Sequence, residues 1–296
     1  MEIPVRVPDC AAHMITAPDA RDDIVWLTKT IGLPRAVYER LSPWQWEHAM
    51  AWAVARSAKS SVVTGTAALC LYGIGYFGRS TCVDLHLPGT MRAKSANRSS
   101  HYARYHSAYL GDDEYQEVNG MRVVWPWRAA RDVALYSSDL AGIVAMDMVR
   151  LACGNVSSRI LGARRYPGKA RIRALLERSV GVSESVIESW GRVLLEDSDI
   201  TCEIKCQVRI RCSDGALYRV DMLIDGWLIL EFDGMLKYST QDDPKREARR
   251  QHSLTNTGYG ILRIEYRHLR EGIFVDMVRQ ALSRGPGFRP GSWSIR

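Results

Sequence analysis

The 296-residue sequence lacks the features that mark membrane, secreted and repeat proteins. No apolar run approaches the roughly eighteen residues that a bilayer requires, and the N-terminus shows no signal-peptide pattern. The seven cysteines are odd in number and scattered, without a CxxC pair, which argues against a disulfide framework. No internal repeat or low-complexity tract is present. These absences predict a packed cytoplasmic protein that has no membrane partner.

Three cysteines nevertheless lie close together in the sequence, at Cys202, Cys206 and Cys212. They share the same parity, so on an extended strand they would point to one face. We expect them to be small core residues, since free cysteine is often buried; a zinc site is the alternative.

The charge is positive, with a formal net value of +7. Residues 159–178 hold seven Lys or Arg residues against Glu177, and residues 92–106 interleave basic residues with Tyr102 and Tyr105. Both runs fit phosphate contacts and aromatic stacking, although a solvated helix face and a loop would explain them equally well. The predicted partner is nucleic acid, with DNA preferred. The residues of the first run that are predicted to bind it are Arg164, Arg165, Lys169 and Arg171.

The order of predicted elements indicates an α+β protein in two parts. Residues 24–58 read as helical, 81–125 as mainly β, and 125–137 as a helix. From Ser185 onward the pattern is helix, hairpin, charged helix, strand and final helix. The expected organisation is a helical region 1–58, an α+β region 59–158, a basic connector 159–180, a C-terminal domain 181–285 and a tail 286–296.

An acidic cluster interrupts the apolar strands of the C-terminal domain. Asp221 breaks the first strand of the hairpin, and Glu231 breaks the second, with Asp233 two residues later. Carboxylates on central strands cost several kcal/mol unless a cation or hydrogen bonds compensate. Oxygen ligands of this kind hold Mg²⁺ or Mn²⁺, which activates water and neutralises phosphate charge.

Each acidic residue also has a simpler explanation. Glu188 follows Ser185 at the spacing of a capping box and could only close its own helix. Asp233 could belong to an ordinary turn, while Arg219 or Lys237 could form structural ion pairs with Asp221 and Glu231.

The hairpin loop decides whether Asp221 and Glu231 can share a site. A two-residue turn at Asp225-Gly226 would put the two carboxylates on opposite faces of the sheet. We therefore predict an odd-length loop or a bulge, for instance three residues with Gly226 in the left-handed conformation.

The segments VDMLIDGWLILEFDGMLKY and KREARRQHSLTNTGYGILRIEY resemble the Vsr-like (very-short-patch-repair-like) domain found at the C-terminus of many actinobacterial proteins. That family belongs to the PD-(D/E)XK nuclease clan, and the resemblance covers residues 181–285. The matching positions are Ser185, Glu188, Asp221, Glu231, Asp233, Gly234, Arg250, Gly258, Tyr259 and Arg263. The resemblance implies a restriction-endonuclease-like mixed sheet flanked by helices, which would act as a Mg²⁺- or Mn²⁺-dependent endonuclease.

The same resemblance suggests roles for individual residues. Glu188, Asp221 and Glu231 would bind metal, and Arg250 and Arg263 would bind phosphate. Asp233 stands where the clan usually has a lysine, so Lys237 is the candidate basic group. His252 would be either a proton shuttle or a helix-surface residue.

Residues 61–137 resemble the AbiEi-type antitoxin family through SVVTGTAALCLYGIG and WPWRAARDVALY. That resemblance implies DNA binding through a winged helix, of which residues 27–41 could be a remnant, and a toxin or repair partner. The alternatives to a nuclease are a catalytically inactive, DNA-binding antitoxin-like regulator and an interaction scaffold in which an arginine fully engages Glu231.

Overall fold

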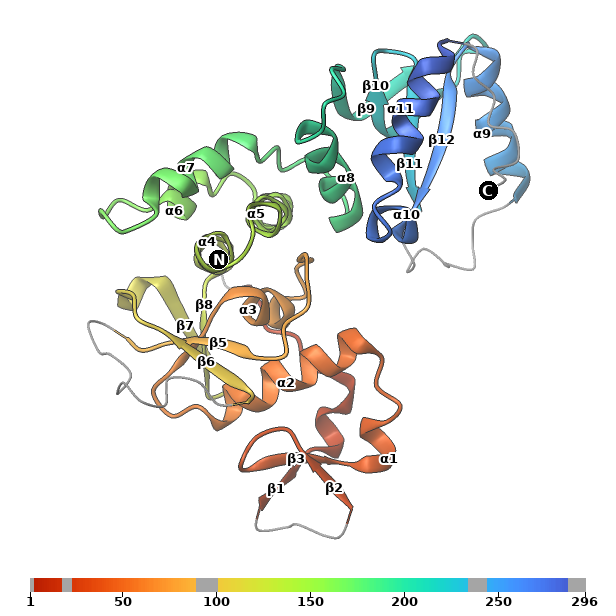
Figure 1. The fold of residues 1–296 in the computed structure, drawn as a ribbon. Coiled ribbons are helices and arrows are strands. Elements are labelled where there is room, and N and C mark those ends of the chain that lie inside the picture. The colour runs from red at the N-terminus through yellow and green to blue at the C-terminus, as the bar shows by residue number, and fades with distance from the viewer. Residues whose placement is uncertain (1–2, 18–22, 89–100, 234–243, 287–296) are drawn as a thin grey trace. The chain divides into compact units, whose positions relative to one another are not determined.

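The computed structural model describes residues 3–17, 23–88, 101–233 and 244–286 (Figure 1). The chain divides into two compact units, residues 1–181 (unit 1) and 182–296 (unit 2). Helices and three sheets together make an α+β protein, which confirms the predicted fold class. Among the described helices, none has both the length and the apolar character needed to cross a bilayer.

Unit 1 begins with a small antiparallel sheet, which corrects the prediction of helix across residues 24–58. Strand β2 (Ile24–Trp26) pairs with β3 (Ile31–Pro34), and β3 also pairs with β1 (Ile15–Thr16). After the short α1 (Arg35–Tyr38), the predicted helix is restricted to α2 (Pro43–Ser57). The sheet forms because Leu33 is completely buried in a cluster with residues of α2, a tertiary contact that local periodicity does not reveal.

A five-stranded sheet forms the centre of unit 1, in the order β6-β5-β4-β8-β7. Its strands are β4 (Val62–Val63), β5 (Val83–His86), β6 (Ala103–His106), β7 (Tyr115–Val118) and β8 (Met121–Val124). Helix α3 (Gly65–Tyr72) follows β4, and α4 (Pro126–Tyr136) follows β8, confirming the helix predicted over 125–137.

The remaining helices of unit 1 are α5 (Asp139–Cys153), α6 (Ser157–Leu161) and α7 (Lys169–Arg178). Helices α6 and α7 both contact α4, and α7 also contacts α5. Residues 159–180, for which the sequence suggested a connector, therefore lie within unit 1, where Ile160 and Ile172 are completely buried.

Unit 2 is a four-stranded mixed sheet in the order β12-β11-β10-β9 (Figure 1). The strands are β9 (Ile204–Arg211), β10 (Leu217–Ile224), β11 (Leu228–Asp233) and β12 (Gly260–Glu265). The helices are α8 (Val186–Glu196), α9 (Pro244–Asn256), α10 (Tyr266–Arg270) and α11 (Phe274–Arg284). Strands β9, β10 and β11 are antiparallel neighbours, whereas β12 runs parallel to β11.

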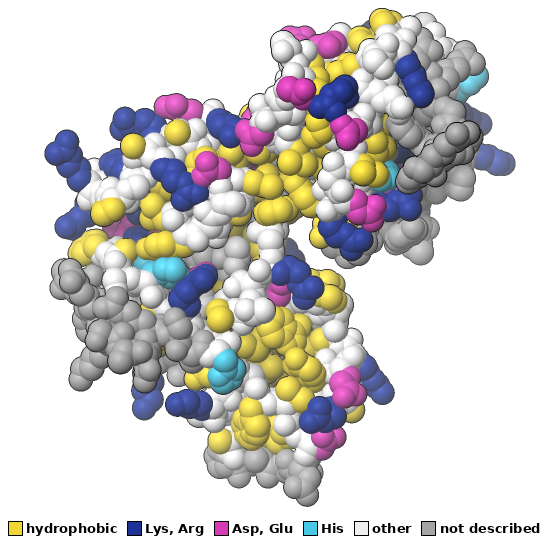
Figure 2. Space-filling view, viewed as in Figure 1, with side chains coloured by type: hydrophobic (Ala, Val, Ile, Leu, Met, Phe, Trp, Pro, Cys, Tyr) yellow, Lys and Arg dark blue, Asp and Glu magenta, His cyan; other side chains and the backbone are white. Residues whose placement is uncertain are grey.

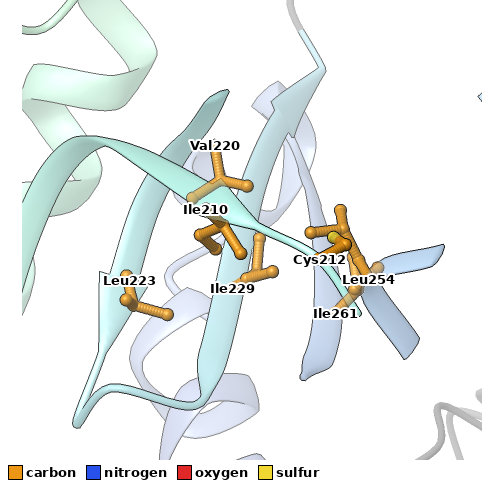
Figure 3. Packing of buried hydrophobic residues seen from close by; sticks show 7 residues of the cluster. All are labelled: Ile210, Cys212, Val220, Leu223, Ile229, Leu254 and Ile261. Atoms are coloured by element: carbon orange, nitrogen blue, oxygen red, sulfur yellow. The ribbon is translucent and has the colours of Figure 1, made fainter. Parts of the chain in front are cut away.

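Alternate side chains of β11 point to different helices. Phe232 packs against Phe274 of α11 and lies against Gly191 of α8, where an added Cβ would come within 2.5 Å of the Phe232 ring. Ile229 belongs instead to a cluster with Leu254 of α9 (Figure 3). By the period of a strand, Glu231 shares the side of Ile229 and so faces α9.

The three clustered cysteines do not share one environment. Cys212 lies in the buried cluster with Leu254, as expected for a core residue, and it is labelled beside Leu254 in Figure 3. Cys202 and Cys206 are only half-buried. The common core face predicted from their parity is therefore correct for Cys212 alone.

Candidate acidic site in unit 2

The hairpin has the three-residue loop that a shared acidic site requires. Ile224 pairs with Leu228, and Met222 pairs with Leu230, so residues 225–227 form the loop. Asp225 and Gly226 both have positive φ, at 48° and 73°. Continuing the same register by one residue places Asp221 opposite Glu231, which confirms the predicted loop geometry.

Asp221 lies between the other two acidic groups. Its Oδ2 accepts a hydrogen bond from the backbone N–H of Phe232 at 2.8 Å, which holds the carboxylate beside the strand that carries Glu231. Its negative charge contributes to raising the pKa of both Glu188 and Glu231. Three carboxylates from α8, β10 and β11 thus interact through one central member.

Glu188 has the capping role that its spacing predicted, together with a contact to the sheet. Its carboxylate accepts hydrogen bonds from Ser185 Oγ at 2.7 Å and from the backbone N–H of Glu184 at 2.9 Å. A third bond, at 2.7 Å, comes from Nε2 of Gln207 on β9. Only 2% of Glu188 is exposed, and its pKa is raised by burial, with repulsion from Asp221 adding to the effect.

Gln207 is a site residue that the sequence did not indicate. Its backbone has φ 54°, in the left-handed region that non-glycine residues rarely adopt. Its Nε2 donates to Glu188, whereas its buried Oε1 has no hydrogen-bond partner among the described residues. A strained backbone and an unsatisfied buried oxygen both cost free energy, and such features are concentrated at functional sites.

Glu231 is paired with an arginine that the sequence analysis assigned to phosphate. Arg250 of α9 donates from Nη2 to Glu231 Oε1 at 2.6 Å and to the backbone carbonyl of Arg219 at 3.1 Å. Burial raises the pKa of Glu231 to about 7, against the opposing attraction of Arg250. Arg219, the partner considered from the sequence, instead bonds Glu184 at 2.6 Å.

The remaining candidates are exposed or lie outside the described residues. Asp233 is 3.9 Å from Arg263, whose guanidinium also donates to Glu247 at 2.5 Å. His252 is on the exposed surface of α9, in agreement with the second of its two predicted roles. Lys237 and Gly234 lie outside the described residues.

The donor chemistry of this cluster suits a divalent cation, but its present arrangement does not provide a ready-made metal site. Carboxylate and amide oxygens are the ligands that Mg²⁺ and Mn²⁺ take, and Gln207 Oε1 is unsatisfied. The raised pKa of Glu188 and of Glu231 indicates incompletely compensated negative charge. Within residues 3–17, 23–88, 101–233 and 244–286, however, no three His, Cys, Asp or Glu side chains are grouped to hold a metal. Arg250 occupies the place at Glu231 that a cation would need.

The basic candidates of unit 1 divide into two kinds. Lys169 donates to the backbone carbonyls of Gly162, Ala163 and Arg164, and Arg171 forms an ion pair with Asp139 at 2.6 Å. These two residues therefore stabilise local structure.

Arg164 and Arg165 remain exposed. On the face shown in Figure 2, Lys and Arg side chains occur over both units. Of the second basic run, residues 92–100 lie outside the described residues.

Unit 1 also contains a buried polar cluster that the sequence did not indicate. Asp132 of α4 accepts hydrogen bonds from Thr64 Oγ1 at 2.5 Å, from His86 Nε2 at 3.1 Å and from Arg128 Nε at 3.0 Å. These partners are separated from Asp132 by up to 68 residues along the chain. His86 thus has a buried structural partner in Asp132.

Comparison of the chain with protein-family models, with curated proteins and with solved structures found no match.

Proposed function

We propose that unit 2 hydrolyses phosphodiester bonds of nucleic acid, preferably DNA, with the help of Mg²⁺ or Mn²⁺. The observation that supports this proposal is the coupling of Asp221 to both Glu188 and Glu231, beside Gln207, which binds Glu188 and whose own Oε1 is unsatisfied. A purely structural sheet has little reason to retain mutually repelling carboxylates beside an unsatisfied polar atom, because each feature lowers stability.

Asp221 and Glu231 would hold the cation, and Glu188 and Gln207 would support it from α8 and β9. The cation would supply charge for the scissile phosphate and favour ionisation of an attacking water. Arg250 would turn from Glu231 to the phosphate, beside Arg263, which lies next to Glu231 in the sheet register.

The test compares the wild-type protein with Asp221→Asn on DNA and on RNA, in Mg²⁺, in Mn²⁺ and with a chelator. We expect wild-type cleavage that needs metal, and a rate at least about 100-fold lower in the variant, equal to about 2.7 kcal/mol of transition-state stabilisation. The matched control is Asp199→Asn, which removes a carboxylate that is 81% exposed on the same unit and should cleave like wild type. Equal cleavage by wild type and Asp221→Asn would refute the enzymatic proposal.

The second candidate is a non-catalytic, DNA-binding regulator, and the ion pair between Glu231 and Arg250 favours it. In that case Arg250 is the permanent counterion of Glu231. The protein would then bind DNA with an affinity that falls steeply with salt, and it would not cleave DNA in any metal.

A further inference from the structure

A large cavity in unit 1, remote in sequence from the acidic cluster, has the composition of a ligand site. Its volume is about 1110 Å³, and it lies among α4, α6, α7 and the segments that follow β6 and α6. Six arginines line it against two acidic residues, Asp113 and Glu114. Ligand cavities are usually concave, with a few convergent polar groups, and this cavity is large enough for a whole nucleotide.

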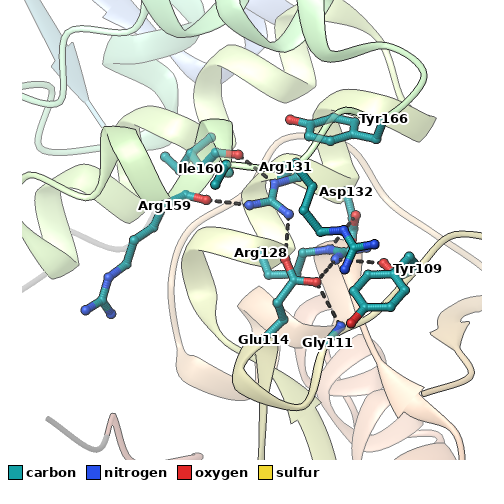
Figure 4. Close-up of polar contacts among 12 residues, drawn as sticks. Tyr109, Gly111, Glu114, Arg128, Arg131, Asp132, Arg159, Ile160 and Tyr166 are labelled. Carbon is teal, nitrogen blue, oxygen red and sulfur yellow. Dashed lines mark hydrogen bonds and ion pairs between the residues drawn. The ribbon is translucent and has the colours of Figure 1, made fainter. Parts of the chain in front are cut away.

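The inner wall of the cavity holds two arginines whose positive charges are balanced by neighbouring carboxylates. Arg128 and Arg131 of α4 are 3% and 5% exposed. Both donate to the carboxylate of Glu114, at 2.5 Å and 2.7 Å, and Arg131 also donates to the backbone carbonyl of Ile160 at 2.6 Å (Figure 4). Because their charges are paired, these two arginines fix the shape of the wall and supply little charge for a ligand.

Three arginines at the edge of the cavity carry positive charge that no ion pair of the described residues balances. Arg159, Arg164 and Arg165 are exposed, and no described carboxylate lies within ion-pair distance of any of them. Arg164 stacks over the ring of Tyr109 at 4.0 Å. The guanidinium of Arg159 points away from Arg131 and Tyr109 (Figure 4), which leaves Arg164 and Arg165 as the exposed basic groups beside the tyrosine. Exposed guanidinium groups at a cavity favour a phosphate-bearing ligand, since the planar fork matches phosphate oxygens.

Two exposed tyrosine rings also line the cavity. Tyr109 and Tyr136 are 44% and 37% exposed, and both line the cavity. Tyr136 is backed by His106, which stacks on it with ring centres 3.8 Å apart. A base can stack on such rings whatever its identity.

We infer that this cavity binds a phosphorylated nucleoside, with the phosphate on Arg164 and Arg165 and the base against Tyr109 or Tyr136. A free mononucleotide and the terminal nucleotide of a single strand share this chemistry. The size of the cavity and its exposed rings argue against a lone inorganic anion, which would leave the aromatic part of the lining unused.

Calorimetric titration of the full-length protein in a chelator tests the inference, because nuclease chemistry that depends on metal is then silent. The probes are ATP, adenosine, pyrophosphate and a short 5′-phosphorylated single-stranded DNA. We expect saturable binding of ATP, with adenosine and pyrophosphate each at least about tenfold weaker, or about 1.4 kcal/mol. DNA binding more tightly than ATP would identify a strand end as the natural ligand, and weaker binding would identify a free nucleotide.

The variant Arg164→Gln/Arg165→Gln should weaken ATP binding at least about tenfold, whereas Arg173→Gln should leave it within about twofold. Arg173 is a matched control because it is exposed on α7 but does not line the cavity. Absence of saturable ATP binding, equal losses in both variants, or pyrophosphate binding as tightly as ATP would each overturn the inference. None of these results depends on whether unit 2 cleaves nucleic acid.

Discussion

Replacement of Glu231 by Gln should stabilise the protein at alkaline pH. The folded protein raises the pKa of Glu231 from 4.5 to about 7, chiefly by burial, so the ionised form is destabilised in the fold. At about 1.36 kcal/mol for each pKa unit, this rise corresponds to about 3 kcal/mol. Glutamine resembles the protonated acid, and Arg250 keeps its bond to the Arg219 carbonyl and an ion pair with Glu247 at 3.6 Å.

The sign of the pH dependence follows from the direction of the pKa change. Because the folded pKa lies above the unfolded one, the stability contributed by protonated Glu231 is complete below pH 4.5 and lost as the pH rises through about 7. Glu231→Gln keeps that stability at every pH. The difference between variant and wild type should therefore be near zero below pH 4.5 and reach about 3 kcal/mol above pH 7.

Urea unfolding at a series of pH values, followed by circular dichroism, measures this difference directly. Glu271→Gln is the control, since its carboxylate is 50% exposed and pairs loosely with Arg270 at 3.4 Å. Its effect should stay below about 0.5 kcal/mol throughout. A difference between Glu231→Gln and wild type that does not change with pH would refute the assignment of the strained charge to Glu231.

Mg²⁺ should also raise the stability of wild type at pH 8, and of Glu231→Gln much less, if the cation binds as proposed.

Two further predictions concern the packing of each unit. Gly191→Ala should destabilise unit 2 by about 1–3 kcal/mol, because the new methyl would lie 2.5 Å from the Phe232 ring; a urea midpoint unchanged from wild type would contradict this. Asp132→Asn should cost about 3 kcal/mol at neutral pH, because it breaks the buried pair with Arg128. Although burial acts in the opposite direction, Arg128 and His86 hold the pKa of Asp132 well below its ordinary value. The stability that ionised Asp132 contributes is present above the ordinary aspartate pKa and is lost as the pH falls below it. The free energies of unfolding of wild type and Asp132→Asn should therefore converge in acid.

Local periodicity and strand geometry were sufficient to predict two features of the fold. The helix over 125–137 was visible in its apolar spacing, and the three-residue loop at 225–227 followed from the need to place two carboxylates on one face. Side chains alternate strictly along a strand, so one residue more or less in the loop moves a side chain to the other face of the sheet.

The features that the sequence did not predict have a different physical cause. Ile24–Trp26 and Ile31–Pro34 were expected to be helical but form strands, because pairing with Ile15–Thr16 and burial against α2 outweigh local preference. Gln207 contacts Glu188, and Arg250 contacts Glu231. In each pair the two residues are 19 positions apart in the sequence. No spacing rule relates such residues.

The amino-acid sequence by itself determined the α+β class, the acidic interruptions at Asp221 and Glu231, and the excess of arginine. These properties belong to single elements or to composition, and so they can be read locally. Only the tertiary structure decided that Arg250 pairs with Glu231, that Glu188 is both a helix cap and a neighbour of Gln207, and that Arg159, Arg164 and Arg165 line a cavity with exposed tyrosines. Those outcomes depend on how distant elements pack, because packing brings together residues that lie far apart in the sequence.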